Sequence, residues 1–171
     1  CKGAMEINIF ILVLGGFLNI VTQTGALEAG IQSVVKKLKG NELKIIPILM
    51  ILFSIGGSTY GMAEETIPFY GLLSATMVAA GFDTFVAVGT VLLGAGSGVI
   101  GSTVNPFSTG VAMDALRGIG IQPNTGIILI VGAILWAAST SYSIFIVMRY
   151  AKKVTADHGY TILSFQEPED M

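Results

Sequence analysis

Residues 56–66 interrupt a long apolar stretch and read Gly56-Gly57-Ser58-Thr59-Tyr60-Gly61-Met62-Ala63-Glu64-Glu65-Thr66. The apolar arms beside them are short, 11 residues from Ile45 to Ile55 and 15 from Ile67 to Gly81. At 1.5 Å per residue, neither arm crosses a hydrocarbon core of about 30 Å as a helix. We therefore predict that residues 45–81 form a re-entrant helical hairpin, although two full crossings would give the same topology.

The composition of the whole chain indicates a membrane protein. Of its 171 residues, 53% are hydrophobic and 12% are charged. Between Ile45 and Met148 the charged side chains are Glu64, Glu65, Asp83, Asp114 and Arg117. Five charges cannot cover the surface of a soluble domain of that size. Intrinsic disorder is excluded as well, because disordered chains are rich in charge and poor in aliphatic residues.

Three further apolar segments complete the predicted fold, which is all-α and integral to the membrane. We expect a transmembrane helix at about 7–30, a broken transmembrane helix at 84–116 and a transmembrane helix at 126–148. The broken helix is predicted because glycines at 94–98 and 101 and then Pro106 interrupt a segment too long for a simple straight crossing. Residues 1–153 then form the membrane domain, and 154–171 a polar cytoplasmic tail or linker.

Clustered basic residues orient this domain. Lys36, Lys37, Lys39 and Lys44 follow the first helix, and Arg149, Lys152 and Lys153 follow the last one. The positive-inside rule places both clusters in the cytoplasm, which fits a cytoplasmic membrane location. The net charge of −2 argues against nucleic-acid binding. One cysteine and one histidine allow neither an internal disulfide nor a histidine-rich metal site.

Glu64 and Glu65 are adjacent carboxylates inside an apolar block. An acid at membrane depth costs at least about 2.5 kcal/mol to insert, so its default interpretation is functional: a proton carrier, a cation ligand or a partner for a cationic substrate group. If the hairpin tip lies at the interface, both side chains are merely solvated. Both residues are candidates for substrate or ion binding.

Two stretches that carry glycines and hydroxyls, residues 57–59 and 101–106, resemble each other in composition. We expect unwound backbone in both, so that carbonyls, hydroxyls and a carboxamide could bind a sodium ion or a substrate carboxylate. The alternative is helix packing, since Gly57-x-x-x-Gly61 and Gly94-x-x-x-Gly98 have the spacing of membrane helix contacts. The candidate residues are Gly57, Ser58, Thr59, Ser102, Thr103, Asn105 and Pro106, with a sodium ion considered near Ser58, Thr59, Thr103 and Asn105.

Other patterns carry less weight. Gly96 to Gly101 spell the G-x-G-x-x-G motif of dinucleotide-binding folds, but Asn105-Pro106 prevents the helix that this motif needs directly after it. No cofactor is therefore expected. Trp136 and the hydroxyls of residues 139–143 are expected to contact neighbouring helices.

At the glycine-rich stretch, the two glutamates and the break, the chain resembles the four-carbon-dicarboxylate anaerobic carrier family, especially its YfcC-like branch, within the ion transporter superfamily. The resemblance rests on Gly56-Gly57 and Gly61-Met62-Ala63-Glu64-Glu65, followed by Asn105-Pro106-Phe107, and extends over about 7–120. It implies a longer carrier of two inverted repeats, of which this chain is most of the first. It also implies that Ser58, Thr59, Glu64 and residues 103–106 form half of a midplane site.

The resemblance leaves the coupling and the substrate open. Relatives with sodium sites carry Ser-Asn-Thr at such tips, whereas this chain has Ser58-Thr59-Tyr60 and Ser102-Thr103-Val104-Asn105. The branch is linked by similarity to both dicarboxylates and amino acids. We predict a non-enzymatic secondary transporter fragment of a bacterial inner membrane, which works by alternating access with sodium or proton coupling, or by exchange. Its expected partners are membrane lipid, the missing second repeat and further copies in a homo-oligomer. The alternatives are an intramembrane enzyme and a structural membrane subunit.

Overall fold

The structure is a computed structural model that describes residues 41–156, Tyr160 and Thr161. Within the first 40 residues it describes positions 5, 9, 12, 13, 16, 17, 20, 23–25, 29, 30, 33, 36 and 37, and the side chains of Glu42 and Glu64 are not described. The chain divides into two units, Cys1–Gly40 and Asn41–Met171. The predicted helix at 7–30 lies largely outside the described residues. Ile9, Leu12 and Phe17 are helical and exposed, but Thr24 and Gly25 form a turn with a Gly25 φ of +66°, so 7–30 is not one uninterrupted helix.

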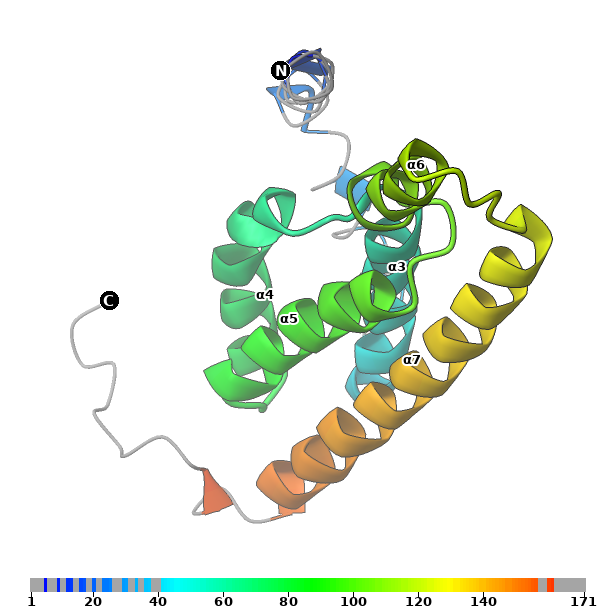
Figure 1. Cartoon of the computed structure of the whole chain (residues 1–171). Helices are drawn as coiled ribbons and strands as arrows, with labels where there is room; N and C mark the ends of the chain where they lie inside the picture. The colour runs from blue at the N-terminus through cyan, green and yellow to red at the C-terminus, as the bar shows by residue number, and fades with distance from the viewer. Residues whose placement is uncertain are drawn as a thin grey trace. The chain divides into compact units, whose positions relative to one another are not determined.

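The second unit is all-helical (Figure 1). The α-helices are α3 (Ile45–Tyr60), α4 (Ile67–Ala79), α5 (Thr84–Ile100), α6 (Val111–Gly118) and α7 (Thr125–Ala156). Short 3-10 turns, η1 (Glu42–Lys44) and η2 (Glu64–Thr66), precede α3 and α4, and a π-helical turn, η3 (Pro106–Gly110), precedes α6. Among the residues that the structure describes, one helix, α7, is long and apolar enough to cross a membrane, while α3, α4 and α5 are shorter apolar helices.

Helix α5 organises the unit, because it packs against α3, α4 and α7. The α3–α5 contact is a backbone contact made possible by glycine. A Cβ atom added at Gly98 would lie 2.1 Å from the Ser54 carbonyl oxygen, and one at Gly57 would lie 2.3 Å from the Ala95 carbonyl oxygen. These glycines therefore serve helix packing, the alternative weighed for the two G-x-x-x-G spacings.

The region predicted as a re-entrant hairpin contains α3, a reversal at residues 61–66, and α4. The arms are 16 and 13 residues long, about 24 and 20 Å, so each remains shorter than a hydrocarbon core of about 30 Å. The two helices meet through Phe53 and Phe69, which are buried and have ring centroids 5.5 Å apart. Much of the packing of both arms is against α5, so the pair does not form a self-contained hairpin.

The structure corrects two predictions of unwound backbone. Residues 57–59 lie within α3, which continues to Tyr60, and residues 94–98 lie within α5, which is unbroken from Thr84 to Ile100. Glycine alone does not end these helices, because each stretch packs against the partner helix and keeps its backbone helical. The turn after α3 comes at Gly61 instead, whose φ of +79° suits glycine and whose N–H donates to the Gly57 carbonyl.

Three predicted boundaries also move. The broken helix was expected at 84–116, but α6, which follows the break, continues to Gly118. Helix α7 continues to Ala156, beyond the expected end at 148, so the predicted tail at 154–171 begins inside a helix. Its 32 residues make it about 48 Å long, which leaves room for an end outside the hydrocarbon core.

Candidate functional site

The end of α3 lies directly against the segment that follows α5. The Ser58 hydroxyl donates a hydrogen bond of 2.9 Å to the Gly101 carbonyl oxygen, and it lies 3.1 Å from the Thr103 hydroxyl. In return, the Thr103 backbone N–H donates to the Ser58 carbonyl oxygen at 3.2 Å. We call this set of hydrogen bonds the tip–break contact. It joins residues 45 positions apart in the chain.

The Ser58 carbonyl is open to this contact because of the way in which α3 ends. In an uninterrupted helix it would accept from the N–H of Met62, but that N–H donates instead to the Gly56 carbonyl in the turn formed by Gly61. The freed carbonyl accepts from the backbone N–H of Thr103 and, at 3.3 Å, from its hydroxyl. A glycine-dependent helix end thus supplies the acceptor for the break in the other helix.

Asn105 is the central side chain of the break and is only 2% exposed. Its carboxamide oxygen accepts from the Phe107 N–H at 2.8 Å, which caps the turn that starts at Pro106. Its amide nitrogen lies 3.3 Å from the Ser102 hydroxyl and donates to it. A Cβ atom added at Gly61 would lie 2.7 Å from this nitrogen, so the turn after α3 presses on Asn105.

Helix α7 supports the break from another side. A Cβ atom at Gly101 would lie 2.1 Å from the Trp136 Cα, and one at Gly132 would lie 2.7 Å from the Ser102 carbonyl oxygen. The Trp136 indole N–H donates to the Ser54 hydroxyl at 3.2 Å, and the Ser139 hydroxyl donates to the Ser97 carbonyl at 2.9 Å. These bonds agree with the expected helix contacts for Trp136 and Ser139, whereas Tyr142, which was expected to contact a helix as well, is 67% exposed.

The two glutamates lie on the α4 side of the reversal. The Glu65 carboxylate accepts from the Ala63 N–H at 3.2 Å, and Glu65 is partly exposed. The backbone of Glu64 begins the turn η2, and its side chain is not described. Thr59 is exposed, and its hydroxyl donates to the Ile55 carbonyl of its own helix at 2.7 Å.

The predicted site residues therefore divide into three groups. Ser58, Ser102, Thr103 and Asn105 come together at the tip–break contact, which Pro106 follows as the first residue of η3. Gly57 is buried against α5. Glu65 and Thr59 lie beside the contact in sequence and bond within their own segments.

Sequence reasoning missed two contributions to this arrangement. Gly61 was noted for its G-x-x-x-G spacing and for the family motif, but not as a helix end, although its turn frees the Ser58 carbonyl and touches Asn105. Thr109 was not considered, although its hydroxyl donates to the Ser102 carbonyl at 3.2 Å. The Gly61 turn had a usable signal, a glycine directly after a helical stretch, whereas nothing local distinguishes Thr109.

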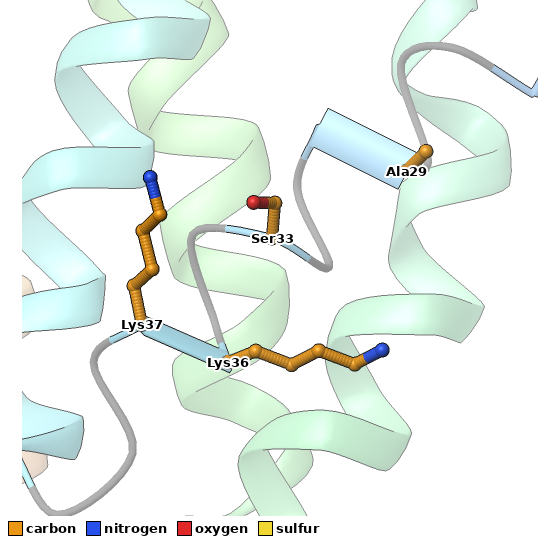
Figure 2. A pocket seen from close by; sticks show the side chains of 4 residues that line it. All are labelled: Ala29, Ser33, Lys36 and Lys37. Atoms are coloured by element: carbon orange, nitrogen blue, oxygen red, sulfur yellow. The ribbon is translucent and has the colours of Figure 1, made fainter.

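Two other features lie outside the tip–break contact. The first unit has an open pocket whose lining includes Ala29, Ser33, Lys36 and Lys37, at the end of the predicted helix and in the joint that follows it (Figure 2). Residues 96–101, which spell G-x-G-x-x-G, lie at the end of α5, and no strand precedes them in the continuous part from 41 to 156. Over the described residues, no group of three or more His, Cys, Asp or Glu side chains could hold a metal ion.

Comparison with known proteins identifies the class as a membrane carrier. The family model described as C4-dicarboxylate anaerobic carrier (DcuC) matches residues 1–169. The chain belongs to this family, which confirms the resemblance found in the sequence. As a family of carriers, it argues against an enzyme, and the apolar helices are consistent with a membrane location.

Two curated relatives match most of the chain. An uncharacterized protein of Haemophilus influenzae is 38% identical over 92% of this chain and 30% of its own length. A protein of Escherichia coli named "Putative basic amino acid antiporter YfcC" is 34% identical over 88% of this chain and 29% of its own length. The chain thus spans about 30% of the length of these relatives. No solved structure matches it significantly.

Proposed function

We propose that this chain supplies one half of the transport site of a secondary carrier, which moves a small carboxylate-bearing metabolite across the bacterial inner membrane by alternating access. The observation that carries the proposal is the tip–break contact. It brings hydroxyls, main-chain carbonyls and the Asn105 carboxamide together where two short apolar arms reverse and a helix is broken. In secondary transporters such interrupted helices meet near the bilayer midplane and bind the solute there.

The short arms support a re-entrant path for α3 and α4. A helix of 16 or 13 residues leaves polar backbone at its end within the hydrocarbon core, which is tolerated only where protein shelters it. The Ser58 and Gly101 carbonyls are sheltered in this way by the tip–break contact. The second half of the site comes from the remaining part of the carrier, an inverted repeat in this proposal.

Charge favours a basic amino acid over a dicarboxylate as the substrate. A dianion needs positive partners, yet Arg117 is the only Lys or Arg between Ile45 and Met148, and it is already paired with Asp114 at 3.0 Å. An ammonium or guanidinium group needs a negative partner, and Glu65 lies at the reversal. The name of the Escherichia coli relative points to the same substrate class. Glu65 would then receive the cationic side chain, and the break would receive the α-carboxylate.

The test is uptake into proteoliposomes by the intact carrier, with Glu65→Gln compared with Asp114→Asn. Each change converts a carboxylate to a carboxamide, but Asp114 is an exposed surface residue paired with Arg117. We expect Glu65→Gln to lower arginine or lysine uptake at least tenfold and Asp114→Asn to change it less than twofold. Wild-type uptake confined to succinate or fumarate would refute the substrate class. Full activity of both Glu65→Gln and Asn105→Ala would remove these residues from transport.

Coupling by sodium is tested in the same assay. The Ser58 and Thr103 hydroxyls are 3.1 Å apart, while the Thr59 hydroxyl bonds back to its own helix. A sodium ion at this place would need Thr59 to change rotamer. We expect uptake driven by an amino acid gradient without sodium, as in exchange, and a strict requirement for sodium would overturn that expectation.

A further inference from the structure

One face of α7 changes from apolar to cationic toward its C-terminal end. Tyr142, Phe145, Ile146, Arg149 and Lys153 follow the i, i+3, i+4, i+7 and i+11 pattern of one helix face, so they lie on the same side of the helix. The first three are 67%, 60% and 41% exposed. With Tyr160 and the intervening Tyr150, these residues line a shallow surface pocket of about 290 Å³, which we call the α7 pocket.

The order of these side chains matches the order of layers at a membrane surface. The predicted span ends at Met148, so Tyr142 and Phe145 fall in the last turns of the span, and Arg149 and Lys153 fall just beyond it. Aromatic rings concentrate at the boundary between acyl chains and headgroups, and Lys and Arg reach the headgroup layer. From Tyr142 to Arg149 is about 10 Å along the helix, so a single lipid could contact both parts.

The cationic end of the pocket carries positive potential. The Lys153 ammonium lies 3.0 Å from the Tyr160 hydroxyl and 4.7 Å from the centre of its ring. This hydrogen bond and the Lys153 charge, with a smaller contribution from Arg149, hold the pKa of Tyr160 below its usual value. Within residues 41–156, 160 and 161, the structure shows an ion pair between Arg117 and Asp114. Neither Arg149 nor Lys153 is paired with a carboxylate in this part of the chain.

The carboxylate of Asp83 lies near the pocket and is already hydrogen-bonded. Asp83 caps the start of α5 by accepting from the Val86 N–H at 2.9 Å. Its second oxygen accepts from the hydroxyls of Tyr150 and Thr161 at 2.5 and 2.8 Å. Asp83 thus fixes the ring of Tyr150, which also packs edge-on against Phe85, with ring centroids 5.3 Å apart. The wall of the pocket is held in place by α5.

We propose that the α7 pocket binds an anionic phospholipid of the inner leaflet, with Arg149 and Lys153 on the lipid phosphate and an acyl chain over Phe145 and Ile146. The charge pattern fits an anion, and the adjoining exposed apolar face fits a hydrocarbon chain, which a free phosphate lacks. The inference goes beyond transport, because none of these residues belongs to the tip–break contact.

Native mass spectrometry of the intact carrier with added cardiolipin, phosphatidylglycerol or phosphatidylcholine tests the proposal. Each basic residue that contacts the anionic headgroup contributes about fivefold in affinity. We expect the double variant Arg149→Gln/Lys153→Gln to weaken binding of cardiolipin and phosphatidylglycerol roughly 25-fold. The matched control is Lys152→Gln, an exposed lysine on the same helix that does not line the pocket; it should weaken binding less than twofold.

Two further arms separate the other occupants. Phe145→Ser should weaken phospholipid binding while leaving the thermal stability of delipidated carrier within about 1 °C, because its side chain is exposed. Equal binding of phosphatidylcholine and phosphatidylglycerol, or displacement of the lipid by millimolar inorganic phosphate, would overturn the proposal. So would a photoreactive amino acid at position 142 that crosslinks to another segment of the carrier and not to lipid.

Discussion

Two neighbouring glycine-rich stretches behave in opposite ways. Residues 94–98 contain three glycines and remain helical, whereas residues 101–105 contain one glycine and interrupt the helix. The packing partners and the next residues in the chain account for the difference. Gly94 and Gly98 let the α3 backbone approach, while Pro106 lacks a backbone donor and Asn105 turns its carboxamide back to cap the next turn. Glycine content alone therefore does not locate an unwound segment.

The strongest way to break this comparison is to add a side chain at Gly98. In Gly98→Leu the new Cβ would lie 2.1 Å from the Ser54 carbonyl oxygen, so α3 and α5 must separate. We expect destabilisation beyond about 4 kcal/mol, seen as loss of folded carrier in fluorescence-detected size-exclusion chromatography. Gly96→Ala is the matched control, because no atom lies within 4 Å of its added Cβ. Comparable yields of Gly98→Leu and wild type would disprove the close packing.

Asn105→Ala tests the break between α5 and η3. It removes the cap on the Phe107 N–H and the bond to Ser102 at a side chain that is 2% exposed, so we expect a loss of about 2 kcal/mol. Thermal unfolding of the intact carrier measures this loss. Asn105→Ser keeps an accepting oxygen without adding a buried charge and should recover part of the stability. If the Ser and Ala variants unfold at the same temperature, an accepting oxygen at this position does not stabilise the turn.

Ser58→Ala has the smallest expected effect on stability of the three changes, and it tests the Ser58 side of the break. It leaves the buried Gly101 carbonyl without the Ser58 hydroxyl, at a cost of about 1 kcal/mol. Thr59→Ala, next to it, removes an exposed hydroxyl that bonds within α3 and should change stability by less than about 0.5 kcal/mol. The difference in unfolding temperature between the two variants isolates the tip–break contact. A larger effect of Thr59→Ala would show that Thr59, and not Ser58, makes the stabilising contact.

The sequence was sufficient for local features with a strong physical signal. Pro106 and Asn105 indicated the break, the charge distribution indicated the membrane, and the motif around Gly61 and Glu64 indicated the family, which the comparisons confirm. Tertiary contacts decided the rest. Whether Gly57 and Gly94 lie in a turn or in a helix depends on the partner backbone against them, and no local pattern contains that information.

The bonds of Ser58 and Thr103 illustrate the same limit at the site. Hydroxyl side chains near glycines predicted ligands for a solute, yet these two donate largely to each other's segment. Their spacing of 45 residues is invisible to any local rule. The roles of Glu64, Glu65 and Asn105 in binding remain predictions for the uptake assay.

The contact between Gly101 and Trp136 has a practical consequence. Trp136 is the sole tryptophan in this chain, and its indole lies between the broken segment and α3. Indole emission responds to the polarity and hydrogen bonding around the ring. A carrier whose other tryptophans are replaced by phenylalanine would therefore hold a built-in optical probe at the place where the two halves of α5–α6 join, able to follow each turnover without an attached dye.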